Sequence, residues 1–212
     1  MEITQLIQNA YNSGAQGYHA YWPRRHEFIE PERKEFMARL PENARILDVG
    51  CGPGQDSEYF SNLGFKVTGI DLSDKFIEIA KKRVPNAAFQ KADMRKLDFL
   101  PEYFDGIWAS FSFLHIPFPD AQKTLAGLLE ILKPGGQIFF AIHTSDTTHD
   151  RTAPIAGLKD HEEQQVSTFV QEWSQEDFKK LLTDAGLEIK IFRPFDRPGG
   201  SYPLLSTLSV KP

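Results

Sequence analysis

The sequence of 212 residues has little cysteine and no excess of positive charge. Its one cysteine, Cys51, excludes an internal disulfide, a metal cage of cysteines alone and a three-cysteine iron–sulfur cluster, and it indicates a reduced, cytoplasmic protein. The 24 lysines and arginines are outnumbered by 29 acidic residues, which gives a net charge of −5. This balance argues against a protein that binds nucleic acid or anionic membranes non-specifically, because such proteins need a basic surface.

The sequence also lacks an apolar run long enough to span a bilayer, since its longest mostly apolar stretch, 107–118, is short and contains polar residues. Residues 1–6 lack the basic start and apolar core of a signal peptide. Apolar residues make up 41% and charged residues 25%, as in an average globular domain. We therefore expect residues 1–212 to form a single soluble domain that does not contact membranes.

Beyond Arg45, short apolar runs alternate with helical patterns. The runs carry no polar alternation and fit parallel strands buried on both faces: 46–49, 67–70, 87–89, 106–109 and 137–142. Helices are predicted between them over 56–63, 74–84 and 121–132, the last two with Ser73 and Asp120 as N-caps. Strand–helix–strand units in series predict an α/β fold with a doubly wound, mostly parallel sheet.

The two ends of the chain differ from this core, which spans 44–142. Residues 1–42 are predicted to form a helical cap with an aromatic connector at 18–23. Residues 143–172 are polar, acidic and without clear periodicity, which is typical of a lid or a mobile loop. Residues 173–212 predict a helix, with Ser174 as its N-cap, and a closing hairpin through 197–200 whose last strand is antiparallel to the rest.

The strongest motif runs from a buried strand through Gly50, Gly52 and Gly54 into a helix. Glycine lets the backbone turn tightly and approach a ligand, and ligands bind at the carboxyl ends of the strands in such sheets. Asp71 ends the second strand, where an acid can accept both ribose hydroxyls of an adenosine. The alternative interpretations are a plain tight turn for the loop and a helix-cap role for Asp71.

Two residues argue against a dinucleotide cofactor. Gln55 stands where the dinucleotide fingerprint needs its third glycine. Asp48, just before the loop, would repel a diphosphate but suits a cationic ligand such as an ammonium or a sulfonium.

Five segments in order resemble the motifs of class I S-adenosylmethionine-dependent methyltransferases: 48–54, 69–73, 91–94, 104–109 and 132–137. The resemblance covers 44–143 closely and 173–212 more loosely. It implies a seven-stranded sheet of order 3-2-1-4-5-7-6 with the last strand antiparallel. It also implies S-adenosyl-L-methionine as cofactor, with its methionine part over Gly50, Gly52 and Gly54, near Asp48, and with its ribose held by Asp71.

For the adenine end, the resemblance implies that Leu72 packs on the ring and that Asp93 accepts from its amino group. Met94 would cover the ring, and the backbone at Ala109 and Ser110 would line the far side.

Four further residues are candidates near the methyl group. Tyr11 and Tyr18 could close over the cofactor, where an aromatic face attracts a sulfonium, or could pack on the edge of the sheet. His115, at the position where many members of the family have a histidine, and His143 could each act as general base or have a structural role. No histidines stand at a metal-ligand spacing, so no metal is expected.

The expected function is methyl transfer to a small-molecule acceptor by in-line displacement. The acidic composition and the absence of an Asn/Asp-Pro-Pro-Tyr element, where the chain has Ala109–Ser112, disfavour nucleic acid. Phe111, Phe113, Phe118 and Trp108 indicate an aromatic pocket or sheet core. The alternatives are a non-catalytic S-adenosylmethionine-binding module and, less favoured, an NAD-dependent oxidoreductase. The sequence leaves open the acceptor, the methylated element (O, N, C or S) and the oligomeric state.

Overall fold

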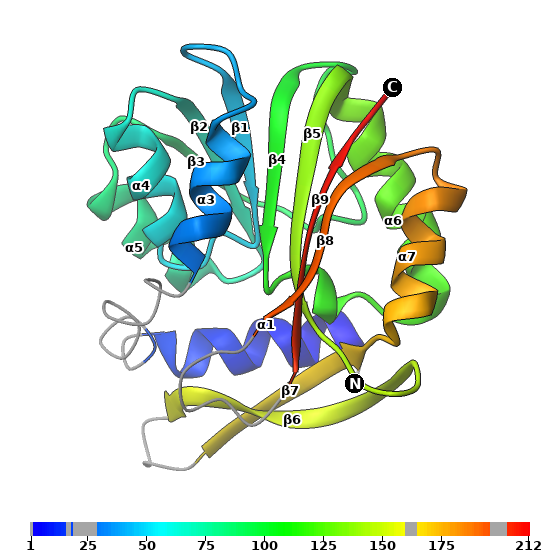
Figure 1. The fold of residues 1–212 in the computed structure, drawn as a ribbon. Coiled ribbons are helices and arrows are strands. Elements are labelled where there is room, and N and C mark those ends of the chain that lie inside the picture. Colours follow the sequence, from blue (N-terminus) through cyan, green and yellow to red (C-terminus); the bar gives the residue numbers. More distant parts are fainter. Residues whose placement is uncertain (1, 16–17, 19–28, 160–164, 196–202) are drawn as a thin grey trace.

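The computed structural model describes residues 2–15, 18, 29–159, 165–195 and 203–212, and for 156–159 only the backbone (Figure 1). Most of the predicted aromatic connector, at 19–23, and the turn at 197–200 lie outside the described residues. In the described part of the chain, no helix is both long enough and apolar enough to cross a membrane.

Seven strands form one sheet in the order β3-β2-β1-β4-β5-β9-β8. They are β1 (Arg45–Val49), β2 (Lys66–Asp71), β3 (Ala88–Lys91), β4 (Phe104–Ser110), β5 (Leu132–His143), β8 (Glu188–Phe195) and β9 (Leu204–Val210). β1 to β5 pair in parallel, and β9 runs antiparallel to both of its neighbours, β5 and β8. The predicted strand order and the antiparallel last strand are therefore confirmed.

Two apolar layers flank this sheet because successive side chains of a strand point to opposite faces. The helices are α1 (Ile3–Ser13), α3 (Glu30–Met37), α4 (Gln55–Asn62), α5 (Asp74–Arg83), α6 (Phe118–Ile131) and α7 (Gln175–Asp184). Leu47 joins the core under α6 and α7, whereas its neighbour Ile46 joins the core under α3 and α4. In this second layer, Trp108 stacks on Phe139 with ring centroids 3.9 Å apart.

The predicted N-caps are confirmed at two helices and wrong at a third. Ser73 caps α5 and Ser174 caps α7, each hydroxyl accepting from a backbone N–H at 3.1 Å. α6 begins at Phe118, two residues before Asp120, so Asp120 lies inside the first turn of the helix. The reason is Pro119, which fits the first helical turn because the N–H groups there have no partner within the helix.

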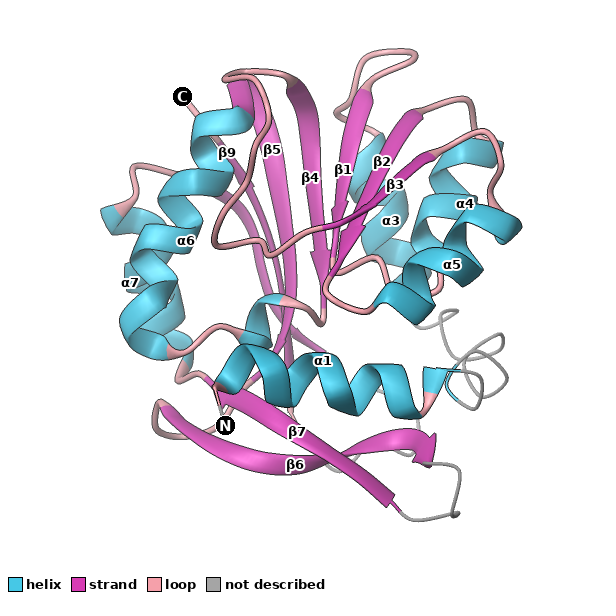
Figure 2. Ribbon diagram, turned by 180° about the vertical axis from the view of Figure 1, so that it is seen from behind, coloured by secondary structure: helices cyan, strands magenta, loops and turns pink. Residues whose placement is uncertain are grey.

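The prediction of an aperiodic loop over 143–172 is wrong. Two strands, β6 (His149–Lys159) and β7 (Gln165–Glu172), pair antiparallel in a separate two-stranded sheet, hereafter the hairpin. Pairing satisfies the backbone polar groups of this polar segment. Figures 1 and 2 show α1 lying between the hairpin and the carboxyl ends of the central strands.

A buried ion pair fastens α3 to the sheet. Arg33 donates to Asp56 through Nε at 2.8 Å and through a terminal nitrogen, and Trp108 Nε1 donates to the other oxygen of the same carboxylate at 2.8 Å. Both Arg33 and Asp56 are buried, so a carboxylate at the start of α4 is held by a helix on one side and a strand on the other. The glycine loop that precedes α4 is thereby fixed at its far end.

Candidate active site

A cavity of about 200 Å³ lies at the carboxyl ends of the parallel strands. Its floor is the loop after β1 together with the ends of β2, β4 and β5, and its cover is α1 and the hairpin. This is the position at which ligands bind in doubly wound sheets.

The glycine loop makes a close approach that a side chain would prevent. Gly50 has φ +69°, and a Cβ added there would lie 2.3 Å from Cβ of Ser112. Gly52 has φ +53° and open space where a Cβ would be. Gly54, at φ +85°, faces Ala80 of α5 and does not line the cavity. Only the first two glycines therefore contribute to the cavity wall.

The carboxylates of Asp48 and Asp71 lie in this floor and accept hydrogen bonds from neutral donors. Asp48 is 2% exposed and accepts from Ser57 Oγ at 2.6 Å, while Asp71 accepts from the backbone N–H groups of Gly52 and Ser73 at 2.9 and 2.8 Å. Within the described part of the chain, neither makes an ion pair. Burial raises the pKa of Asp48 well above its usual range, helped by the nearby charge of Asp56. Burial likewise raises the pKa of Asp71 to about 6. Both sites would gain from a ligand that brings positive charge or hydrogen-bond donors.

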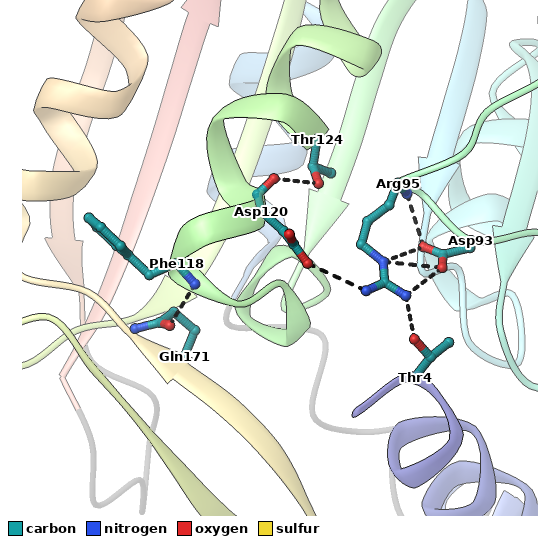
Figure 3. Close-up of polar contacts among 7 residues, drawn as sticks. All are labelled: Thr4, Asp93, Arg95, Phe118, Asp120, Thr124 and Gln171. Atoms are coloured by element: carbon teal, nitrogen blue, oxygen red, sulfur yellow. Dashed lines mark hydrogen bonds and ion pairs between the residues drawn. The ribbon is translucent and has the colours of Figure 1, made fainter. Parts of the chain in front are cut away.

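Asp93 is engaged by Arg95, two residues further along the chain (Figure 3). Arg95 donates to it from its backbone N–H at 2.9 Å and from its guanidinium at 2.6 to 3.1 Å. These bonds hold the pKa of Asp93 below its usual value although the group is partly desolvated. The same guanidinium donates to Thr4 of α1 and lies 3.6 Å from Asp120 at the start of α6. Arg95 thus joins the adenine end predicted from the sequence to the cover of the cavity.

His115 has both ring nitrogens engaged. Nδ1 lies 2.7 Å from the carbonyl oxygen of Phe169 in β7, and Nε2 lies 2.8 Å from the hydroxyl of Tyr11 in α1. A carbonyl only accepts, so Nδ1 carries the proton and Nε2 accepts from the phenol. Burial lowers the pKa of His115 to about 4, which keeps the ring neutral at physiological pH. These two hydrogen bonds connect α1 and the hairpin to His115, which follows the end of β4.

Most residues expected at the site line the cavity: Tyr11, Tyr18, Asp48, Gly50, Gly52, Asp71, Leu72, Asp93, Met94, Ser110, His115 and His143. Gly54 and Ala109 do not; Ala109 is fully buried in the sheet core. Of the four aromatics considered for the pocket, Phe111 lines it, Trp108 and Phe113 lie in the core, and Phe118 is about half exposed.

The sequence predicted a helical cap and a lid, but it missed the further residues of α1 and the hairpin that line the cavity. α1 contributes Thr4 and Ile7 beside Tyr11, a spacing that places all three on one helical face. The hairpin contributes Arg151, Ala153, Pro154, Ile155, Thr168 and Val170. The available signal was the alternation of β-branched residues at 166, 168 and 170, which is typical of a strand with one covered face.

Comparison with known proteins identifies the family. The profile of a family described as "Methyltransferase domain" matches residues 46–136. The Bacillus subtilis (strain 168) protein named "Putative methyltransferase YqeM" is 30% identical over 170 residues, which are 77% of this chain and 68% of that protein. The S-adenosyl-L-methionine-dependent Diels-Alderase iliD of Neonectria sp. (strain DH2) is 32% identical over 191 residues, or 85% and 75% of the two chains. The chain belongs to the S-adenosylmethionine-dependent methyltransferases.

The fold of this methyltransferase is shared with solved structures. The 1,6-didemethyltoxoflavin-N1-methyltransferase of Burkholderia thailandensis, solved with 1,6-didemethyltoxoflavin and S-adenosylhomocysteine, superposes with a TM-score of 0.77 at 21% identity. The match covers 98% of this chain and 88% of that one.

The residues of the cavity fit S-adenosyl-L-methionine. Buried side-chain atoms of its lining residues that have no hydrogen-bond partner among the described residues include Gln55 Nε2, Ser110 Oγ, Ser112 Oγ and Thr168 Oγ1. Ser112 packs against Gly50, and the buried Asp48 lines the same cavity. Donors and acceptors without partners are costly in a folded protein, and a zwitterionic, cationic ligand with ribose hydroxyls would satisfy them.

We expect Gly50→Ala to weaken cofactor binding, because the methyl group adds a clash with Ser112 to an unfavourable φ. Calorimetric titration with S-adenosylhomocysteine should show affinity reduced at least about 10-fold, the equivalent of roughly 1.4 kcal/mol. The matched control is Gly64→Ala. Gly64 has φ +90°, open space where a Cβ would be, and no place in the cavity lining, so this variant introduces the backbone strain without a clash. Equal losses in both variants would contradict this role of Gly50.

Asp71 should make the protein less stable as pH rises. Its folded pKa of about 6 exceeds the unfolded value, so the cost of ionising it is absent below about pH 4 and complete above pH 6. Relative to Asp71→Asn, the ligand-free protein should lose roughly 2 kcal/mol of unfolding free energy between those values. Urea denaturation across pH 4 to 7.5 measures this difference, and a pH-independent difference would show that Asp71 is not desolvated.

Proposed function

We propose that this protein transfers a methyl group from S-adenosyl-L-methionine to a small-molecule acceptor by in-line displacement. The observation that carries the proposal is the covered cavity: the residues expected to bind the cofactor line its floor, and α1 and the hairpin cover it. The Burkholderia structure, which contains 1,6-didemethyltoxoflavin, supports an acceptor of this size.

Within the cavity, the chain would hold the cofactor from three sides. Gly50 and Gly52 give backbone access to its methionine part near Asp48, and Asp71 accepts from the ribose hydroxyls. Leu72 and Met94 would enclose the adenine, whose amino group would donate to Asp93 beside Arg95. Tyr18 adds an aromatic wall.

The cofactor supplies an activated methyl group, so the protein has to orient the acceptor and exclude water. α1 and the hairpin serve this purpose because they cover the carboxyl ends of the strands. We assign His115 to positioning: its Nε2 is occupied by Tyr11, and a ring with a pKa of about 4 is a weak base. His143 lines the acceptor side of the cavity and is the remaining candidate for proton removal.

We further propose a single domain acting in the cytoplasm on a free small molecule rather than on nucleic acid. The buried single cysteine, the net charge of −5 and the cavity covered by α1 and the hairpin support this proposal.

Calorimetry with S-adenosylhomocysteine tests the cofactor, and formation of S-adenosylhomocysteine from S-adenosylmethionine across a panel of small acceptors tests transfer. We expect binding by the wild type, loss of binding in Asp71→Ala, and no binding of NAD. Product formation that depends on an acceptor supports the proposal. Cofactor binding without transfer to any acceptor would favour a non-catalytic binding module instead.

The positioning role of His115 predicts coupling with Tyr11. Tyr11→Phe removes the donor and His115→Asn removes the acceptor Nε2 while keeping an N–H for the Phe169 carbonyl. In urea denaturation, a double-mutant cycle should give a coupling energy of about 1 kcal/mol. Each single variant should keep at least about a tenth of the activity, whereas loss of a general base costs roughly 100-fold or more. Such a large loss in His115→Asn alone would make His115 the base.

A further inference from the structure

We infer that Thr168 of the hairpin is a specificity residue whose hydroxyl receives a hydrogen bond from, or gives one to, a neutral, ring-bearing acceptor. The inference rests on the proposed function, because it places the acceptor in the same cavity, opposite the glycine loop.

The hydroxyl of Thr168 is buried and has no hydrogen-bond partner within the described part of the chain. Its side chain is 1% exposed, lines the cavity, and its Oγ1 has no hydrogen-bond partner among the described residues. Leaving such a hydroxyl unpaired is unfavourable, because it loses its hydrogen bonds to water and gains none in the protein. A valine would fill the same space without this cost, so the hydroxyl is explained best by a ligand group.

The position of Thr168 on the hairpin directs it at the cavity. Alternate residues of a strand share a face, so Val166, Thr168 and Val170 point the same way. Val166 packs with the cluster of α1, and Val170 packs with Leu114 after β4. Thr168 lies between these two apolar contacts, opposite Ala153 in the register of β6 and β7. The small alanine leaves room beside the hydroxyl.

The charges around this part of the cavity favour a neutral acceptor. Arg151 lines the cavity, but its Nε and a terminal nitrogen each lie 2.6 Å from Oε1 of Glu172, which is buried. An anionic acceptor would have to compete with this carboxylate for the guanidinium, and it would share the cavity with the carboxylate of Asp71. A cationic acceptor would face the guanidinium instead.

The walls favour a ring. Phe111 and His143 line the cavity with ring centroids 6.1 Å apart. Phe111 has φ +54°, a strained conformation that bulky residues rarely adopt. The fold therefore holds this aromatic side chain in the wall at an energetic cost.

The test compares the same substitution, threonine to valine, at two positions. Thr168→Val removes the hydroxyl at the cavity, and Thr207→Val removes a buried, unpartnered hydroxyl in β9 that does not line it. Both proteins are titrated calorimetrically with 4-hydroxyquinoline, a neutral ring with a hydrogen-bonding group, in saturating S-adenosylhomocysteine. The charged comparison probe is 4-hydroxyquinoline-2-carboxylate.

We expect the wild type and Thr207→Val to bind 4-hydroxyquinoline equally and Thr168→Val to bind it at least about 5-fold more weakly, with unchanged affinity for S-adenosylhomocysteine. The carboxylate should bind the wild type more weakly than the neutral probe does. Three results overturn the inference: no binding of the neutral probe, equal affinity in both variants, or tighter binding of the carboxylate. If S-adenosylhomocysteine itself fails to bind the wild type, the proposed function fails first, and this readout separates the two failures.

Discussion

The burial of Asp48 and Asp71 at the carboxyl ends of adjacent strands is the constraint on which the rest of the site depends. Backbone N–H groups and the Ser57 hydroxyl stabilise these carboxylates in part, and burial still raises the pKa of both. The protein thus carries a local electrostatic cost that a cationic, hydroxyl-rich ligand would relieve. The glycine loop matters for the same reason, since Gly50 lets the backbone lie against Ser112 in the wall of the cavity that Asp48 and Asp71 also line.

The cover of the cavity is fastened through residues that line the cavity. Arg95 joins Asp93 to Thr4 and Asp120, so the start of α1 and the start of α6 meet at this carboxylate (Figure 3). His115 joins Tyr11 to the backbone of β7 at the other end of α1. Each fastening therefore involves residues that line the cavity, so a ligand bound there would contact the same residues that hold the cover in place.

The sequence predicted the core well because local rules decide it. Unbroken apolar runs and a glycine turn specify the parallel strands and the loop between β1 and α4, whatever the rest of the chain does. The hairpin was missed because β6 contains Pro154 and polar residues, and its stability comes from pairing with β7 and from contact with α1 rather than from propensity. The Arg95 bridge was missed for a related reason: its partners Thr4 and Asp120 are distant in sequence, and only the fold brings them together.

The division between core and cover has a consequence for specificity. The part that matches the methyltransferase-domain family, 46–136, supplies the floor, whereas α1 and the hairpin lie outside it. Displacement at a methyl group needs little from the protein beyond alignment and a dry cavity, so the floor can serve many acceptors. Selection then falls to residues of the cover, and these include a hydroxyl without a partner and a guanidinium already bound to Glu172. A polar group kept unpaired in an apolar wall discriminates strongly, because an acceptor that cannot bond it leaves the full desolvation cost in place.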